Sequence, residues 1–418
     1  MNVISFVDTL GLGGTEKAAC RWARGLQERG HQVTVLTLVD GPRRADLEQH
    51  HVPFHVVSSA AGPIAGLLKK IGPEIIHTHC PGQPHIGDVL GEALKRLPRI
   101  PVVQTNVFGH LYNPREDAWT DFRLFVSWSS CVQAARRMFR RLDESFFQRA
   151  SVAVNPLDAV DSPSEAEVRR FREGLGVKPG EVVFGQLCRP DPRRWSEMPL
   201  QAFRRAQRVC GHLKFLIREP PPEIAKSIAR SSDADRFIIL PVTADPEELR
   251  RTIASLDVVL HYSSVGESFG YGIAEPMNLG KPAIVNFAPW NNMAPLELVR
   301  HGECGFAAAT AEGMTKAIVW LGSDPEKRRQ MGERAQNRIR QLANPGTSLD
   351  RLESALSATA AGRTNPRAKE DLDLAMATAK YLRQHQFGDT WREQAVLRPF
   401  YYRVRFHEWR KHFQFAPR

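Results

Sequence analysis

The sequence has no long apolar runs. Its longest apolar stretches, such as 33–39, stay well below the roughly 20 residues that a helix needs to span a bilayer, so no transmembrane helix is expected. The first residues, MNVISFVD, show neither the basic segment nor the long apolar core of a secretory signal. They predict a first β-strand, and we expect a cytoplasmic protein.

Cysteine is scarce and scattered. The six cysteines form no CxxC pair and have no metal-ligand spacing with histidine, which argues against a zinc site and a disulfide framework. We expect small buried thiols, and neither a metal nor another cofactor.

Negative charge is in deficit, because 46 Asp and Glu face 57 Lys and Arg and leave a net charge of +11. This surplus favours anionic partners such as nucleotide diphosphates, lipid phosphates, membrane surfaces or nucleic acids. It does not choose among them.

Short apolar strands alternate with amphipathic helices in both halves of the chain, and 418 residues with 42% hydrophobic content can build two cores. In the first half, strands are predicted at 3–7, 33–39, 75–79 and 102–107, with a helix at 16–29. In the second half, strands are predicted at 182–187, 215–217, 237–240, 258–261 and up to 285, with helices at 165–175, 199–209 and 246–255. The alternation predicts two Rossmann-like domains with parallel sheets.

A stretch rich in Pro, Asp and Ser near 155–164 marks the boundary between the two domains. We place the first domain at 1–160 and the second at 161–345. The remaining segment, 346–418, is predicted to be helical, with a basic and aromatic end.

A glycine-rich turn, GLGGTE at 11–16, follows the first predicted strand. Gly13 and Gly14 let backbone amides approach an anion at the start of the next helix. The turn is not the GxGxxG fingerprint, because Glu16 stands where that pattern has Gly. A plain tight turn is the alternative.

A second glycine-rich stretch, HYSSVGESFGYGIAE at 261–275, carries Glu267 and Glu275 eight residues apart. In a helix this spacing would span about 12 Å, with Glu267 at the mouth of the loop and Glu275 two turns in. The amides of 268–270 can meet phosphate or hydroxyl groups, and a carboxylate can hold vicinal hydroxyls of a sugar. The pair therefore predicts a site for one extended ligand.

This Glu-x7-Glu arrangement, with a Phe-Gly pair inside it, resembles the donor site of retaining GT-B glycosyltransferases, particularly glycosyltransferase family 4. The resemblance implies that Glu275 holds the nucleotide ribose and that Glu267 contacts the donor sugar. It also implies that the sugar and diphosphate are lined by Ser268, Phe269, Gly270 and Tyr271.

A second match follows the strand at 182–187. Members of the family commonly carry an Arg and, five residues later, a Lys that together neutralise the donor diphosphate, and Arg189 and Arg194 occupy these positions. Arginine keeps the charge and adds a planar fork suited to phosphate. Trp195 stands where Gly is common, so the path of this loop stays open. A solvated basic turn is the alternative.

The acceptor side is less clear. Family members often present a His after the strand that corresponds to 102–105, whereas His110 comes three residues late here. His110 is our candidate catalytic histidine, with Asn106 as the alternative polar contact. His77 and His79 share one face of the strand at 75–79, and His79 is nearer the ligand-binding end. A role in the core is the main interpretation for both.

Two Asp-x-Asp sequences, at 233–235 and 371–373, lie on helix-like segments. We interpret both as surface charge and not as the metal site of a GT-A enzyme. Cations and amide dipoles can stabilise a leaving diphosphate without a metal. No residue is a convincing nucleophile, which fits the same-face attack by which the family's retention is generally explained.

The final segment interleaves basic and aromatic residues from Trp391 to Phe413. Packing on the protein is the main interpretation, since GT-B enzymes often return a C-terminal helix to the first domain. Contact with an anionic membrane or a lipid acceptor is the second. Nucleic-acid binding is the third, and no recognised motif supports it.

Together these features predict an α/β protein of the GT-B fold, with two facing Rossmann-like domains and a C-terminal helical segment that crosses back to the first. The resemblance implies retaining, metal-independent transfer of a sugar from a UDP- or GDP-linked donor. The acceptor would be a glycan, a lipid-linked intermediate or a small molecule. The alternatives are a sugar-nucleotide epimerase or phosphorylase of the same fold, and a non-catalytic glycan-binding scaffold.

Overall fold

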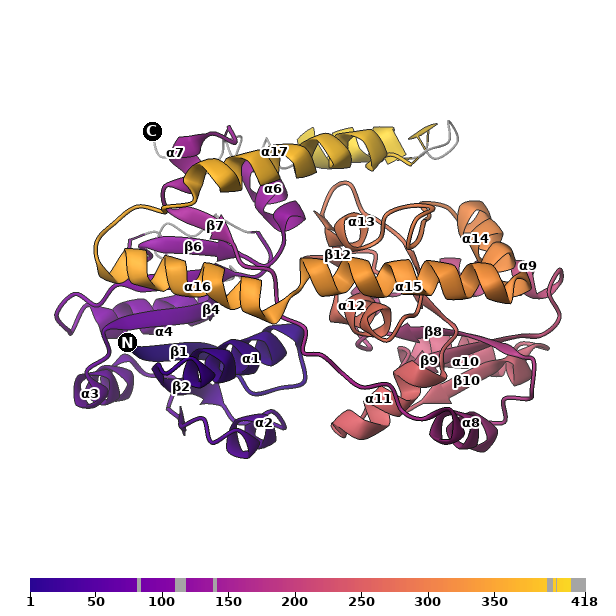
Figure 1. Cartoon of the computed structure of the whole chain (residues 1–418), viewed down its shortest axis with the longest axis horizontal. Coiled ribbons are helices and arrows are strands. Elements are labelled where there is room, and N and C mark those ends of the chain that lie inside the picture. The colour runs from indigo at the N-terminus through magenta and orange to yellow at the C-terminus, as the bar shows by residue number, and fades with distance from the viewer. Residues whose placement is uncertain (81–83, 110–117, 138–140, 389–393, 396, 407–418) are drawn as a thin grey trace. The chain divides into compact units, whose positions relative to one another are not determined.

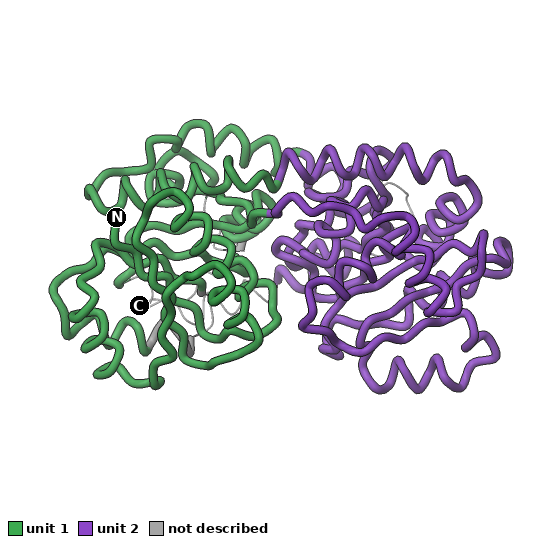
Figure 2. The backbone as a smooth tube through the Cα atoms, turned by 60° about the horizontal axis from the view of Figure 1, so that its bottom comes forward, with its two compact units in different colours: residues 1–156, 343–380 green, residues 157–342, 381–418 purple. Residues whose placement is uncertain are grey.

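The computed structural model describes residues 1–80, 84–109, 118–137, 141–388, 394–395 and 397–406 (Figure 1). The chain forms two compact units, 1–156 with 343–380 and 157–342 with 381–418 (Figure 2). The boundaries expected at 160 and 345 thus lie a few residues beyond the observed ones. The segment 346–418 is not one separate part, because its first helices pack on the first unit, whereas its described residues from 381 to 406 are grouped with the second.

A seven-stranded parallel sheet forms the centre of the first unit, in the order β3-β2-β1-β4-β5-β6-β7. Its strands are β1 (Asn2–Thr9), β2 (Gln32–Val39), β3 (Phe54–Val56), β4 (Ile75–Cys80), β5 (Val102–Asn106), β6 (Phe122–Phe125) and β7 (Ala150–Val152). The helices are α1 (Gly14–Glu28), α2 (Arg44–Gln49), α3 (Ala61–Ile71), α4 (Pro84–Leu94), α6 (Trp128–Arg137), α7 (Glu144–Phe147), α16 (Pro345–Ala360) and α17 (Ala368–His385), of which the last residues belong to the second unit.

The short apolar runs of the sequence form the buried strands of this sheet. Residues 3–7 of β1 are all buried, as expected for a parallel strand with helices on both faces. On one face α1 buries Trp22 and Leu26.

The return of the C-terminal helices to the first unit is confirmed. α16 packs on α1 and on strands β4 to β7 (Figure 1). The helices α1 and α16 approach so closely that a Cβ atom on Gly25 would lie 2.7 Å from Leu349.

The interpretation of 371–373 as surface charge is wrong for Asp371. This carboxylate is 0% exposed and accepts hydrogen bonds from Arg351 at 2.6 Å and from the Asn365 side-chain amide at 2.8 Å. Asn365 also donates to the carbonyls of Phe147 and Ala150. Asp371 therefore ties α17 to α16 and to the strand β7 region, whereas Asp373 is exposed as expected.

A six-stranded parallel sheet forms the centre of the second unit, in the order β10-β9-β8-β11-β13-β15. Its strands are β8 (Val182–Leu187), β9 (Leu213–Arg218), β10 (Phe237–Leu240), β11 (Val258–His261), β13 (Ala283–Val285) and β15 (Gly305–Ala307), and a separate parallel pair joins β12 (Gly266–Glu267) to β14 (Asn292–Met293). The helices are α8 (Glu165–Gly174), η1 (Pro192–Arg194), α9 (Met198–Gln207), α10 (Pro222–Ala229), η2 (Ala234–Arg236), α11 (Pro246–Ser255), α12 (Tyr271–Asn278), α13 (Ala294–Leu298), α14 (Ala311–Ser323) and α15 (Pro325–Leu342).

An aromatic cluster holds α9 against one face of this sheet. Phe203 of α9 packs on Phe215 and Phe237 with ring centroids 5.2 and 5.4 Å apart. On β8, a Cβ atom at Gly185 would overlap the side chain of Leu256, which follows α11, so the glycine lets this buried side chain pack directly on the strand. This packing fixes the end of β8, from which the candidate site begins.

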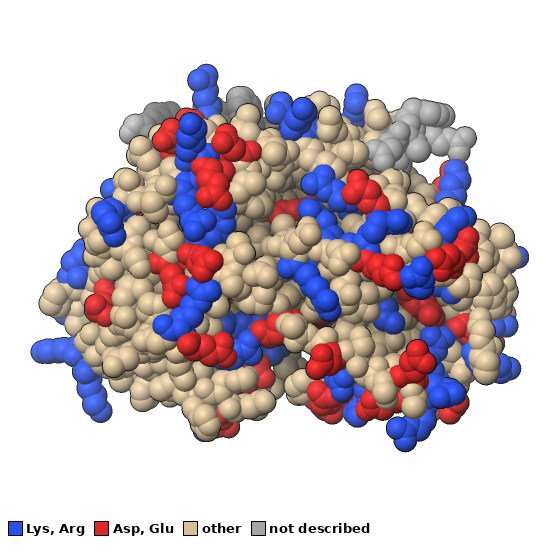
Figure 3. Space-filling model, viewed as in Figure 1, with Lys and Arg blue, Asp and Glu red and all other residues tan. Residues whose placement is uncertain are grey.

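The surface charge is mixed on the face shown in Figure 3, where Lys and Arg lie among Asp and Glu over both units. The net charge of +11 is therefore not gathered into one basic field on that face. None of the helices in the described ranges has the length and apolar character needed to cross a bilayer.

Candidate functional site

The loop after β8 carries the two predicted phosphate-binding arginines. Asp191 caps the short helix η1 by accepting a hydrogen bond from the Arg193 amide. The buried indole of Trp195 donates to the carbonyl of Arg189 at 2.7 Å. Trp195, which stands where Gly is common in the family, thus holds this loop together through its hydrogen bond.

The loop after β11 folds against the same turn. Ser264 donates its amide to the Arg194 carbonyl, and Ser263 is held at both its amide and its carbonyl by the side chain of Asn286. Gly266 has φ +68°, and a Cβ atom there would overlap the carbonyl oxygen of Asn292. Only glycine fits this position without strain, and the residue that follows it is Glu267.

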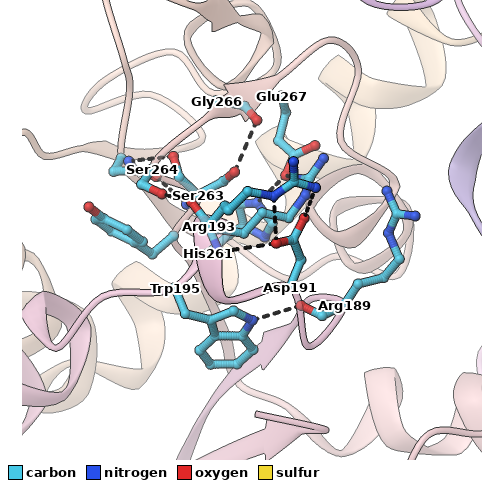
Figure 4. A network of polar contacts seen from close by, with 12 residues as sticks. Arg189, Asp191, Arg193, Trp195, His261, Ser263, Ser264, Gly266 and Glu267 are labelled. Atoms are coloured by element: carbon cyan, nitrogen blue, oxygen red, sulfur yellow. Dashed lines mark hydrogen bonds and ion pairs between the residues drawn. The ribbon is translucent and has the colours of Figure 1, made fainter. Parts of the chain in front are cut away.

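Glu267 is the centre of a polar network (Figure 4). Its Oε1 accepts a hydrogen bond from Arg194 Nη1 at 2.6 Å and lies 3.2 Å from His261 Nε2. The side chains of Arg194 and Glu267 are each 13% exposed. The structure therefore brings Glu267 and Arg194 together as a largely buried ion pair.

The ionisation of this pair follows from its surroundings. Burial alone would raise the pKa of Glu267, but the hydrogen bond to His261 and the charge of Arg194 outweigh it, and the pKa lies below its usual value. For Arg194, burial opposes the charge, yet the carboxylate of Glu267 keeps the pKa above its usual value. Both groups are charged at neutral pH.

Arg189 differs from Arg194. Its side chain is exposed and stands apart from the network in Figure 4. Arg193, in the same turn, is committed to Asp191 by two hydrogen bonds. The thiol of nearby Cys188 stays neutral, because burial and the charge of Glu267 raise its pKa to about 12. Arg189 is thus the arginine of this loop best placed for an anion.

Helix α12 begins later than the sequence suggested. It starts at Tyr271, with Gly270 as N-cap in the left-handed conformation at φ +94°. Since Glu267 belongs to β12, Glu275 lies just over one helical turn into α12, and the expectation of two turns was wrong. Phe269 is 3% exposed and packs edge-on against Tyr271, so its ring offers a ligand little surface. Ser268 is buried and Tyr271 is half-buried.

The other predicted residues belong to the first unit. Gly13 is the N-cap of α1, and a Cβ atom there would overlap the carboxylate of Glu16, which also accepts a hydrogen bond from Thr9. The Glu16 carboxylate therefore already lies at the start of α1, where Gly13 and Gly14 were predicted to let an anion approach. His110 lies outside the described residues, and Asn106 is buried at the end of β5.

His77 and His79 are buried on β4, at 0% and 1% exposure. His77 Nε2 lies 2.7 Å from Thr105 Oγ1, and the two imidazole rings lie 4.3 Å apart. Burial lowers the pKa of His77 to about 3, and burial together with the neighbouring His77 holds the pKa of His79 well below its usual value. Both rings are neutral members of the core.

His261 is the site residue that sequence reasoning missed. The only signal was a histidine at the end of an otherwise apolar strand, Val258–His261, six residues before Glu267. Among the residues that the structure describes, no group of three or more His, Cys, Asp or Glu side chains is arranged to hold a metal ion.

Comparison with known proteins places these features in a family. The family model of the glycosyl transferase 4-like domain matches residues 13–185, and that of glycosyl transferases group 1 matches residues 222–338. The second match contains Glu267 and Glu275 together with the loop and helix that carry them.

Individual relatives are distant in sequence. Trehalose synthase of Pyrococcus horikoshii is 23% identical over 186 residues, so that the match covers 42% of this chain and less than half, 44%, of the relative. The structure of HepE from Anabaena, in complex with UDP and glucose, superposes with a TM-score of 0.70 at 20% identity and covers 86% of this chain and 100% of that one. Sucrose-phosphate synthase of Thermosynechococcus elongatus gives a TM-score of 0.67 at 16% identity, with coverages of 87% and 100%.

Two parallel α/β units, a C-terminal helix that returns to the first unit, and two family matches in the same order therefore agree. The chain belongs to the glycosyltransferases of the GT-B fold, with a glycosyl transferase 4-like domain followed by a group 1 domain.

Proposed function

We propose that the protein transfers a sugar from a nucleotide diphosphate sugar, UDP- or GDP-linked, with retention of anomeric configuration and without a metal ion. The observation that carries this proposal is the set of groups around Glu267: an ionised carboxylate, the exposed Arg189 and the glycine-capped start of α12. The carboxylate can bind a sugar hydroxyl, and Arg189 can bind a diphosphate. The start of α12 can stabilise the negative charge of that diphosphate. HepE has been solved with UDP and with UDP-glucose, which supports a UDP-linked donor.

Departure of the nucleoside diphosphate creates negative charge, and catalysis needs groups that meet this charge as it develops. Arg189 supplies a cation. The start of α12, which no side chain caps, supplies the positive end of a helix dipole and its amide groups. Glu275, on the same helix, would hold the ribose.

Of the two routes that retain anomeric configuration, the site favours attack on the same face as the departing phosphate over a covalent sugar–enzyme intermediate. A nucleophilic carboxylate needs an available electron pair and a moderate pKa. Glu267 has one oxygen bound by Arg194 and close to His261, and its pKa is lowered. These contacts make it a weaker nucleophile and suit it to binding a sugar hydroxyl.

Donor binding is the first test. UDP-glucose and GDP-mannose are titrated into the wild-type protein and into Glu275→Ala by calorimetry, with Glu223→Ala as the matched control, since Glu223 is an exposed Glu in the first turn of another helix of the same unit. We expect Glu275→Ala to weaken binding by about 10- to 100-fold, the loss of hydrogen bonds to a charged group. Equal affinity in all three proteins would contradict the assignment of Glu275 to the ribose.

Product analysis separates the alternatives. NMR of the product anomer, with a panel of glycan, lipid-linked and small-molecule acceptors, should show the donor's configuration kept. Epimerised donor without an acceptor would show an epimerase, and cleavage that depends on phosphate would show a phosphorylase. A protein that binds no nucleotide sugar would be a scaffold. Turnover unchanged by EDTA is expected if no metal takes part.

We also propose that the C-terminal segment contacts an anionic membrane surface and that the chain works in a reducing compartment such as the cytoplasm. Residues 397–406 are helical. One side of this helix is anchored, since Leu397 is buried and Phe400 packs on Trp290 at 4.5 Å.

The other side of the helix carries Tyr402 and Phe406, which are 63% and 60% exposed, with the exposed Arg398 and Arg403 beside them. Aromatic rings flanked by cations suit the boundary between lipid headgroups and acyl chains. Cys20, Cys188, Cys210 and Cys304 carry free thiols, which fits a reducing environment.

Flotation with vesicles tests the membrane contact. We expect binding to vesicles of phosphatidylcholine with 30% phosphatidylglycerol, about the anionic content needed for electrostatic attraction, and weak binding to phosphatidylcholine alone. The double variant Tyr402→Ser, Phe406→Ser should lose binding. The control variant Leu374→Ser, Met376→Ser, which changes two exposed residues of α17, should keep it. Equal flotation of both variants would refute the contact and favour packing of the tail on the protein.

A further inference from the structure

His261 occupies a position where a polar side chain is costly. It ends β11, whose other residues are Val258, Val259 and Leu260, and it is 2% exposed. Its Nδ1 is buried and has no hydrogen-bond partner among the described residues. A buried polar atom without a partner costs stability, so an apolar residue would pack here at lower cost.

The contact with Glu267 offsets this loss of stability. Nε2 of His261 and Nη1 of Arg194 both approach the same carboxylate oxygen, Oε1, at 3.2 and 2.6 Å. No contact within the described part of the chain uses Oε2. One oxygen is therefore saturated and the other keeps its lone pairs for a ligand.

The imidazole ring is itself held in place. A Cβ atom at Gly272, in the first turn of α12, would lie 3.6 Å from Nδ1 of His261 and would collide with the carbonyl of Leu187 at the end of β8. The ring thus lies against the first turn of α12, which itself packs on the end of β8. A rigid donor fixes the rotation of the carboxylate that it contacts.

We propose that His261 is a positioning residue that, together with Arg194, holds Oε1 of Glu267 so that Oε2 alone is presented to one hydroxyl of the donor sugar. This inference rests on the proposed function, because it assigns the sugar to Glu267. It adds a residue that is not one of the Glu-x7-Glu pair or the Arg pair. It also assigns Glu267 a single hydroxyl, in contrast to the vicinal pair expected at Glu275.

The charged and titratable groups near Glu267 come from three elements: Arg194 from η1, Arg189 and Cys188 from the loop after β8, and His261 from β11. Loss of His261 removes a hydrogen bond that lowers the pKa of Glu267, while burial continues to raise it. The pKa of Glu267 should therefore rise in a variant without this donor.

The test compares His261→Leu, which keeps the volume and removes the donor, with His261→Gln, which keeps a neutral donor of similar reach. The control is His212→Leu, an exposed histidine of the same unit whose Nε2 contacts the Gly322 carbonyl at 3.1 Å. We expect His261→Leu to fold and to lower kcat/KM for the donor by about 10- to 100-fold. We expect His261→Gln to recover most of this loss and His212→Leu to match the wild type.

The pH profile separates positioning from a structural role. The acid limb of kcat/KM should move to higher pH in His261→Leu and stay in place in His261→Gln. Wild-type activity in His261→Leu would overturn the proposal, as would equal loss of activity and of melting temperature in both variants.

A second measurement does not depend on activity. The Cδ signals of 13C-labelled glutamate are titrated by NMR, and the signal of Glu267 is assigned from its absence in Glu267→Gln. A higher pKa for this carboxyl in His261→Leu than in wild type supports the positioning role, and an unchanged pKa refutes it. If the wild type shows no transfer at all, the proposed function fails, while this titration still decides whether His261 acts on Glu267.

Discussion

Arg194 Nη1 lies 2.6 Å from Glu267 Oε1, so a cation expected to bind phosphate is already paired with the carboxylate expected to bind the sugar. On the proposed function, the two arginines of this loop would have different roles: Arg194 would orient the carboxylate, and Arg189 would bind the diphosphate.

We expect Arg189→Ala to weaken UDP or GDP binding by about 10- to 100-fold, because it removes a charge-assisted contact with phosphate. Arg193→Ala should change binding little, since Arg193 is 83% exposed and paired with Asp191. Calorimetry at two salt concentrations measures both, and the salt dependence should weaken in Arg189→Ala alone. If Arg193→Ala had the larger effect, the assignment would be reversed.

Arg194→Ala should cost stability as well as activity. It leaves the Glu267 carboxylate largely buried without its cation, a change that typically costs about 2–5 kcal/mol. The double variant Arg194→Met, Glu267→Leu should recover much of the free energy of unfolding and remain inactive. Urea denaturation and donor turnover measure the two effects, and a double variant no more stable than Arg194→Ala would contradict this account.

Gly266→Ala should disturb the site more than the fold. It combines an unfavourable φ of +68° with an overlap on the Asn292 carbonyl oxygen, and so displaces β12 and Glu267. Gly302→Ala is the matched control, with φ +77° and open space around the added methyl group. Each should lose about 1 kcal/mol or more from the backbone, but only Gly266→Ala should lose most of its turnover.

Substitutions of Asp371 and of Asp373 should differ in their effect on the free energy of unfolding. Asp371→Ala removes the 2.6 Å partner of the buried Arg351, which keeps its contact with Glu370 at 2.7 Å, so the free energy of unfolding should fall by about 1–3 kcal/mol. Asp373→Ala, at an exposed position two residues on, should change it by less than about 0.5 kcal/mol. A metal-dependent loss of turnover in both variants would instead mark a metal site.

Stability should fall in mild acid because of His77 and His79. Their pKa values are low in the folded state and ordinary, near 6.5, in the unfolded state, so only the unfolded chain takes up protons as the pH drops below that value. The penalty is absent above pH 6.5 and grows by at most about 1.4 kcal/mol per pH unit for each histidine, levelling off for His77 below about pH 3.

Denaturation at pH 7.5 and pH 5 measures this effect. The variant His79→Leu should lose less stability than the wild type between the two pH values, and His212→Leu should behave as the wild type does. An equal drop in all three proteins would assign the acid sensitivity to other groups.

Local patterns predicted much of this fold. The strands at 237–240 and 258–261 and the helix at 246–255 were placed correctly, because apolar runs, capping residues and proline act within a few residues of themselves. The short strand β12 was missed, since two residues become a strand only by pairing with β14, far along the chain. The same pairing delays the start of α12 and moves Glu275 closer to its beginning.

Contacts between residues far apart in the sequence explain the remaining errors of the sequence-based prediction. Arg194 and Glu267 are 73 residues apart, and no spacing rule predicts that one neutralises the other. Asp371 was expected at the surface because its own helix is polar around it, whereas its burial depends on Arg351 of another helix and on Asn365 in the connecting turn. The sequence indicates which groups are charged, and only the folded chain shows which of them are paired.

The interrupted first unit has a consequence for synthesis on the ribosome. Strands β4 to β7 leave the exit tunnel long before α16, the helix that packs on them. Until residue 360 has been translated, the apolar surface that Leu352 and Leu356 bury has no covering helix. The second sheet, by contrast, has all its strands by residue 307. The nascent chain therefore completes its second sheet before the first sheet receives its covering helix, while the second unit still waits for residues after 380, and a chaperone would have most to protect on the sheet that is made first.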